Sequence, residues 1–174
     1  NMGLGEKQVT CCLQIYFNMR KFYFLLFAFF AALSAFATEP ITPASNLTTS
    51  NVQGNAMTVN FTRGGGTARI AFLKMGSPVT AIPQNGNSYL TSSTFGNGQQ
   101  LAPGEFVVYN SGCSAQSFQI TNLTPETEYF IALFEYNGSG LTSEYLTSSY
   151  LSGSVFTLFA PTVQPTSFSA SNIT

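Results

Sequence analysis

Apolar and polar side chains alternate with a period of two along much of the chain, which predicts β-strands with one buried face. The alternation is strictest in residues 57–61, where Met, Val and Phe are separated by Thr and Asn. Residues 40–55 are typical of a linker that enters an edge strand, where prolines are tolerated. Further short apolar segments of strand length occur at 68–74, 105–109, 117–121, 129–136 and 154–159. The pattern predicts an all-β domain.

The segment 129–136 is apolar on both faces, because Tyr129 and Leu133 point one way and Phe130 and Phe134 the other. A strand of this kind is covered on both faces. The cover is expected from residues 75–104, which are rich in Pro, Gly and Asn but carry isolated apolar side chains. A structureless loop of this length is uncommon inside a domain. We therefore expect a packed insertion, with a short hairpin between Ile82 and Tyr89 that turns at Asn85-Gly86.

A turn signal directly precedes this strand. The sequence there is Leu123-Thr124-Pro125-Glu126-Thr127-Glu128-Tyr129, in which Pro125 fixes φ and interrupts regular structure. This Leu-x-Pro-x-Thr-x-Tyr corner resembles the corner between strands E and F of a fibronectin type III domain. The resemblance implies that the Tyr129 hydroxyl bonds back to the upstream backbone, with Leu123 and Pro125 shaping the corner. Phe61 stands where many domains of that family carry a core tryptophan.

Most of residues 40–160 resembles the fibronectin type III-like repeats of large secreted proteins from Bacteroidetes-type bacteria. The resemblance is carried by the corner and by Asn60-Phe61-Thr62-Arg63-Gly64, Phe95-Gly96-Asn97-Gly98, Phe106-Val107-Val108-Tyr109 and Phe134-Glu135-Tyr136-Asn137-Gly138. It implies an immunoglobulin-like (fibronectin type III-like) antiparallel β-sandwich over residues 38–160, with an insertion after strand C. It also implies a non-catalytic extracellular spacer or adhesion module, joined to neighbouring domains of the same chain. It supplies no catalytic residue and no cofactor.

The N-terminal residues predict a targeting segment. Residues 19–37 combine a basic start, an apolar run and an Ala-Phe-Ala end, which is the pattern of a secretory signal peptide cleaved before Thr38. A transmembrane anchor is the alternative, although the apolar run is short for a bilayer crossing. We expect a secreted protein that meets the membrane only through this peptide, and we interpret residues 1–18 as a non-native upstream extension.

The entry segment of the domain recurs after the last predicted strand. Pro161 lies 121 residues after Pro40, and Ser171-Asn172 lies at the same spacing from Ser50-Asn51. Similarity at a fixed period is the signature of repeated domains. Residues 161–174 are therefore predicted to be a linker and the start of a second repeat.

Composition matters mainly for what it excludes. The chain has no His and no Asp, which removes Ser-His-Asp and Cys-His catalysis, His-based zinc sites and Asp-rich calcium loops. Charged residues make up 7% and the formal net charge is −1, so no basic patch is available for nucleic acid. Cys113 is the single cysteine after the predicted cleavage site, which leaves no internal disulfide. The glycine-rich stretch 63–67 lacks a phosphate-loop ending, so a flexible connection is expected there.

Glu135 is the one carboxylate that strand periodicity directs into the core. A buried carboxylate needs a cation, hydrogen bonds or a proton. The cations available in the domain are Arg63, Arg69 and Lys74. We expect a structural ion pair near one end of the sandwich rather than a catalytic acid, because glycosidase chemistry needs two opposed carboxylates in a cleft.

Several tyrosines are candidate ligand-facing residues, namely Tyr89, Tyr145 and Tyr150. Aromatic faces with polar tips suit sugar stacking, which favours a carbohydrate-binding module as the alternative function. The competing interpretation is that these rings pack the insertion against the sheet. The partners expected from the sequence are therefore neighbouring domains and, in addition, an extracellular protein or a glycan.

Overall fold

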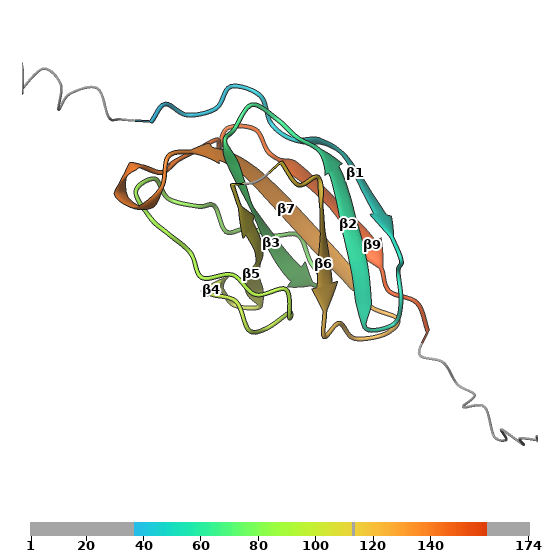
Figure 1. Ribbon diagram of the computed structural model, residues 1–174. Helices are drawn as coiled ribbons and strands as arrows, with labels where there is room; N and C mark the ends of the chain where they lie inside the picture. The colour runs from blue at the N-terminus through green and yellow to red at the C-terminus, as the bar shows by residue number, and fades with distance from the viewer. Residues whose placement is uncertain (1–36, 113, 160–174) are drawn as a thin grey trace, which may run out of the picture. The chain divides into compact units, whose positions relative to one another are not determined.

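Two antiparallel β-sheets packed face to face form the domain in the computed structural model, which describes residues 37–112 and 114–159 (Figure 1). In the first sheet the strand order is β1-β2-β6, and in the second it is β4-β5-β3-β7, with β8 and β9 both pairing with the far side of β7. The strands are β1 (Ser45–Ser50), β2 (Ala56–Thr62), β3 (Ala68–Met75), β4 (Gln100–Ala102), β5 (Glu105–Ser111), β6 (Ser117–Thr121), β7 (Glu128–Asn137), β8 (Glu144–Tyr145) and β9 (Leu151–Phe156). A 3-10 turn, η1 (Gly140–Thr142), precedes β8. The all-β sandwich predicted from the sequence is confirmed.

The main core lies between the two sheets. Alternate residues of β2 supply Met57, Val59 and Phe61, and β7 supplies Tyr129, Ile131 and Leu133 from the opposite side. The strand periodicities read from the sequence are therefore confirmed for both strands. Ala71 and Leu73 of β3 belong to the same core. Ile70 and Phe72 lie on the other face of this strand, as the alternation of residues along a strand predicts.

A second apolar cluster lies on the outer face of the larger sheet. Phe72, Phe134 and Tyr145 are buried there, and Val79, Ala81 and Tyr89 of the insertion pack against them. The expectation that residues 75–104 cover this face is confirmed. The second core explains why β7 is apolar on both sides.

The predicted hairpin between Ile82 and Tyr89 is wrong. Asn85 and Gly86 do form a turn, but no strands flank it. The turn instead packs on the loop after β7, where Gly86 N donates to Ser143 O at 2.8 Å and Asn85 Oδ1 accepts from Tyr145 N at 2.8 Å. These two bonds fix the turn of the insertion to the segment that follows β7.

The rest of the insertion closes one side of the sandwich. Thr94 pairs in parallel with Thr121 at the end of β6, and Thr121 N donates to Ser93 O at 2.8 Å. The same segment reaches the other sheet, where Val107 N of β5 donates to Gln99 O at 3.0 Å. The gap between the β5 and β6 edges is therefore bridged by backbone hydrogen bonds.

The chain enters and leaves this domain at opposite ends of β7. Thr38 O accepts a hydrogen bond at 2.7 Å from the side chain of Asn137, the last residue of β7. Leu158 O accepts from Glu126 N at 3.3 Å, two residues before β7 begins. Ten residues of extended strand span about 33 Å, so entry and exit are separated by about the length of the sandwich.

Some sequence predictions shift or fall outside the described residues. The last strand, β9, begins at Leu151 and ends at Phe156, a few residues earlier than the predicted 154–159. The upstream extension, the signal peptide up to residue 36, Cys113 and the second repeat lie outside the described residues. Among the residues that are described, no helix is long and apolar enough to cross a membrane.

Candidate functional site

The corner before β7 has the geometry that the sequence predicts. Tyr129 is fully buried, and its hydroxyl accepts a hydrogen bond at 2.9 Å from Thr124 N. Leu123 is buried beside it in the main core. The bond fixes the crossover from β6 to β7, so it ties the first sheet to the second.

Replacing Tyr129 with phenylalanine is expected to lower the free energy of unfolding by about 1–3 kcal/mol, because the Thr124 amide loses its acceptor. Urea denaturation followed by far-UV circular dichroism measures the change. Tyr150→Phe is the matched control, since that ring is partly exposed and its hydroxyl has no hydrogen bond to a described residue. Equal free energies for the two variants would contradict a structural role of the corner.

Glu135 forms a buried ion pair with Arg69. The Arg69 Nε lies 3.2 Å from Glu135 Oε1, both side chains are fully buried, and Nη2 lies 3.3 Å from Oε2. The two residues are directly opposite each other on β3 and β7. The structure thus identifies Arg69 as the cation that the sequence left open among three.

The glycine-rich stretch 63–67 wraps around the same carboxylate. Gly64 N donates to Glu135 Oε1 at 2.8 Å and Gly66 N donates to Oε2 at 3.1 Å. A Cβ on Gly66 would lie 2.7 Å from Oε2, and one on Gly64 would overlap the backbone of Thr42. Glycine is needed here for close approach, and the loop that it forms is held by an internal carboxylate.

A second buried carboxylate, Glu105, anchors the start of the insertion. It accepts hydrogen bonds from Lys74 Nζ at 2.9 Å, from the Thr80 hydroxyl at 2.7 Å, and from the Thr80 and Ala81 amides at 3.1 and 2.6 Å. Burial raises the pKa of this carboxyl, but the hydrogen bonds from Lys74, Thr80 and Ala81 together outweigh burial and lower the pKa to about 2. Sequence reasoning did not single out this residue. Its position two residues before the buried Val107, on the same face of β5, was the available signal.

Two of the three candidate ligand-facing tyrosines are structural. Tyr145 is 2% exposed, and its hydroxyl donates to Asn87 O at 2.9 Å. Burial raises the pKa of Tyr145 to about 12. Tyr89 packs edge-on against Tyr145 with ring centroids 5.9 Å apart, and its hydroxyl accepts from Gln84 N at 2.7 Å. Tyr145 is too buried to face a ligand, whereas Tyr89 is partly exposed, and both rings hold the insertion on the sheet.

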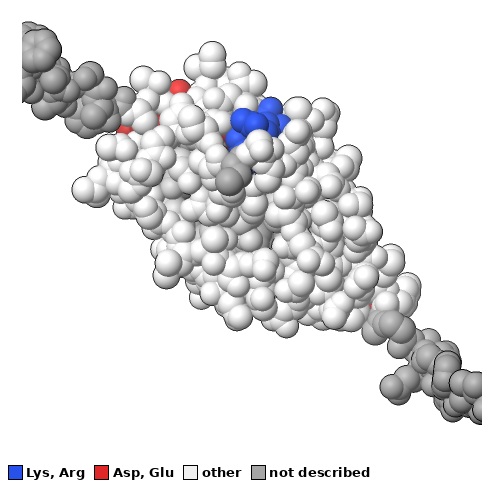
Figure 2. Space-filling model, viewed as in Figure 1, with Lys and Arg blue, Asp and Glu red and all other residues white. Residues whose placement is uncertain are grey.

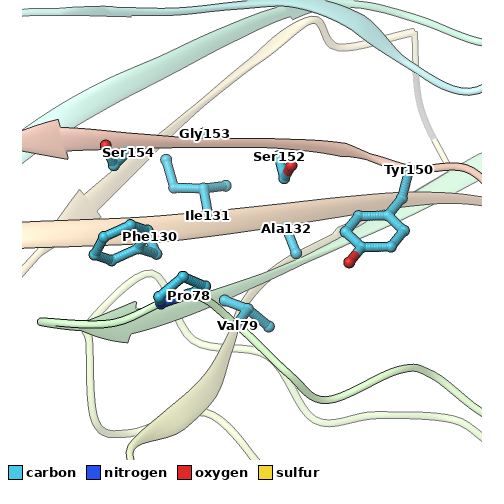
Figure 3. A pocket seen from close by; sticks show the side chains of 9 residues that line it. All are labelled: Pro78, Val79, Phe130, Ile131, Ala132, Tyr150, Ser152, Gly153 and Ser154. Atoms are coloured by element: carbon cyan, nitrogen blue, oxygen red, sulfur yellow. The ribbon is translucent and has the colours of Figure 1, made fainter.

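Tyr150 is the remaining candidate, and it borders a groove. Its ring stacks on Phe134 at 4.5 Å, and the side chain is 38% exposed. The groove has a volume of about 240 Å³ and lies over β7, between the first residues of the insertion and β9 (Figure 3). Its lining is formed by Pro78, Val79, Phe130, Ile131, Ala132, Tyr150, Ser152, Gly153 and Ser154. The groove marks where the insertion stops covering the sheet.

The chemistry of the groove is neutral. No charged residue lines it, and its polar side chains are the hydroxyls of Tyr150, Ser152 and Ser154. Among the described residues, no three His, Cys, Asp or Glu side chains lie together in a way that would hold a metal ion. Figure 2 shows a face that is almost entirely uncharged, with one small cluster of basic side chains. Arg69 and Lys74 are already paired with carboxylates.

Comparison with known proteins gives structural likeness only. No family model and no curated protein matches the chain. A computationally redesigned β-sandwich protein is 16% identical with a TM-score of 0.47, and it covers 71% of this chain and 97% of its own. The fibronectin type III domain of human collagen XX is 19% identical, with a TM-score of 0.42 and coverages of 71% and 99%. That of human fibronectin type III domain containing protein 3 is 13% identical, with a TM-score of 0.42 and coverages of 78% and 99%.

The strand order decides the architecture. A three-stranded sheet of β1, β2 and β6 faces a sheet in which β3, β7 and β9 are adjacent, and a tyrosine corner joins them before β7. The fold is fibronectin type III-like. Relative to that plan the chain adds two elements. The insertion after β3 covers the outer face of the larger sheet, and the short β8 pairs with the end of β7 and adds Tyr145 to the apolar cluster on that face.

Proposed function

We propose that this domain is a non-catalytic module of a secreted multidomain protein, of the kind found in Bacteroidetes-type bacteria, and that it serves as a spacer that holds its neighbours apart. The observation that carries the proposal is the separation of entry and exit. Thr38 is fixed beside the last residue of β7, and Leu158 is fixed beside the residues that precede β7. A domain inserted in this way lengthens the chain by about 33 Å.

Rigidity at both ends supports the spacer role. At the entry end, Glu39 accepts a hydrogen bond from Thr147 N at 3.3 Å, and the loop 63–67 is clamped by Glu135. At the exit end, Thr157 Oγ1 donates to Thr124 O at 2.7 Å and accepts from Thr127 N at 3.0 Å. Loops whose backbone groups are hydrogen-bonded to side chains open locally less readily than loops whose backbone groups are hydrogen-bonded only to water.

The surface chemistry fits a neutral interaction module. Two of the three cations in the described residues, Arg69 and Lys74, are held in internal ion pairs, which leaves Arg63 as the exposed one. A surface with so few basic side chains has little attraction for nucleic acid. Adhesion or protein interaction would then rely on apolar contacts and backbone hydrogen bonds. The carbohydrate-binding alternative is weakened, because Tyr145 and Tyr89, two of its three tyrosines, pack in the apolar cluster on the outer face of the larger sheet.

Small-angle X-ray scattering of one, two and three joined copies of residues 38–160 tests the spacer. The maximum dimension is expected to grow by about 33 Å for each added copy, because entry and exit lie at opposite ends of the sandwich. A set of copies joined at the same positions but carrying Glu135→Ala is the control for rigidity. A dimension that stays nearly constant as copies are added would contradict the proposal.

A further inference from the structure

The edge of β9 is the one sheet edge in the described residues that carries no protection. Edge strands are normally blunted by charge, proline, irregular register, shortness or a covering loop. The β4 and β8 edges are three and two residues long, β1 has an irregular register and the end of β6 is paired with residues of the insertion. β9 pairs with β7 in continuous register over all six residues and contains neither charge nor proline. Its outer backbone groups have no hydrogen-bond partner in the described chain.

An exposed aromatic side chain lies on the same strand. Phe156 is 60% exposed and shares the outer face of β9 with Ser152 and Ser154, while Leu151 and Val155 point to the main core. The groove lies on that same outer face, where Ser152 is paired with Ala132 of β7 (Figure 3). Ser152 and Ser154 lie between the free edge and the groove, and their side chains are small. An apolar side chain from an added strand can therefore extend over them into the groove.

We propose that two copies of this chain associate through antiparallel pairing of β9 with β9, about a twofold axis at Ser154. In this register Ser154 of one copy pairs with Ser154 of the other, and Phe156 of one copy lies opposite Ser152 of the other. Residues directly opposite in an antiparallel pair point to the same face. Each Phe156 therefore extends toward the groove of the other copy, beside Tyr150 and Ala132.

A second copy fits this edge better than a charged partner. The strand is uncharged and the formal net charge of the chain is −1, so two copies meet without strong repulsion. The contact is isologous, so each copy supplies both the aromatic side chain and the groove. Each Phe156 is already partly buried, so the two rings add at most about 300–500 Å² of contact area. The association is therefore expected to be weak and reversible. The expected state is a monomer at low concentration and a dimer where copies are crowded.

Sedimentation velocity on the full chain, from about 10 µM to about 1 mM, tests the association. We expect a reversible rise of the weight-average sedimentation coefficient toward that of a dimer. Ser154→Lys places two lysines face to face on the axis and is expected to raise the dissociation constant tenfold or more. Ser88→Lys adds the same charge on an exposed part of the insertion and is expected to change nothing. A chain that stays monomeric at the highest concentration would overturn the proposal. Binding of a glycan or a foreign peptide in the groove, without any self-association, would also overturn it.

Disulfide trapping tests the register. Directly opposite Cα atoms in an antiparallel pair lie about 4.5–5.5 Å apart, which is within the range of a disulfide. In a background with serine at Cys11, Cys12 and Cys113, Ser154→Cys is expected to give a covalent dimer under mild oxidation at least tenfold faster than Ser88→Cys. Both positions are exposed, so circular dichroism is expected to show folded variants. Equal rates at the two positions would overturn the Ser154 axis.

Discussion

Glu135→Ala is expected to lower the free energy of unfolding by about 3–5 kcal/mol, which is the usual cost of removing one partner from a buried ion pair. Arg69 would stay fully buried without its carboxylate, and the amides of Gly64 and Gly66 would lose their acceptor. The loss combines an uncompensated charge with two unsatisfied donors. Urea denaturation followed by far-UV circular dichroism measures the change, and the midpoint is expected to fall without a change of slope.

The matched control is Glu128→Ala, which removes an exposed carboxylate from the first residue of the same strand. That change is expected to stay within about 0.5 kcal/mol of the original chain. A double replacement, Glu135→Leu with Arg69→Met, is expected to recover most of the loss, because a buried pair is often replaced by apolar residues at little cost. The role of the pair in stability would be refuted if Glu135→Ala and Glu128→Ala unfolded at the same urea concentration.

The sequence predicts this buried pair in part. Strand periodicity directs Glu135 to the core on the face of Leu133, but it leaves the cation open among three candidates. In the structure Arg69 lies on the same face of β3 as Ala71, which belongs to the main core. What periodicity does not supply is register. Arg69 is opposite Glu135 because β3 and β7 align Ala68 with Tyr136, and that alignment depends on contacts far apart in the chain.

The insertion shows where local rules fail. Asn-Gly is a strong hairpin signal, and the turn forms at Asn85 and Gly86 as the local chemistry dictates. No strands flank the turn, and the turn is held instead by Ser143 and Tyr145, nearly sixty residues later. Turn propensity depends on about four consecutive residues, whereas the segment that pairs with them depends on contacts between residues far apart in the chain.

The sequence also does not show which of the tyrosines after β7 is buried and which is exposed. Tyr145 and Tyr150 have similar polar surroundings in the sequence, and no periodicity distinguishes them. In the structure Tyr145 is paired with Tyr136 through β8 and is covered by Tyr89. Tyr150 comes just before β9, across the groove from the first residues of the insertion, and is partly exposed. Its exposure depends on where the insertion ends, which is a property of tertiary packing.

Glu105→Gln is expected to destabilise the domain by about 3 kcal/mol at neutral pH, and the effect is expected to disappear in acid. The pKa of this carboxyl in the folded chain is lowered to about 2 from an ordinary value of 4.5. The difference corresponds to about 3 kcal/mol of stabilisation from the charged form. A lowered pKa gives stability that is fully present above pH 4.5 and is lost as the pH falls through 2.

Urea denaturation of both chains at pH 7 and at pH 2 measures this dependence. The gap between the original chain and Glu105→Gln is expected to be widest at pH 7 and to narrow steeply between pH 4.5 and pH 2. Glu128→Gln, in which an exposed carboxylate is changed, is expected to show no gap at either pH. A gap for Glu105→Gln that is the same at both pH values would mean that the charge of Glu105 does not hold the insertion. The stabilisation would then come from the shape of the side chain, and Lys74 and Thr80 would be packing partners rather than ligands of a carboxylate.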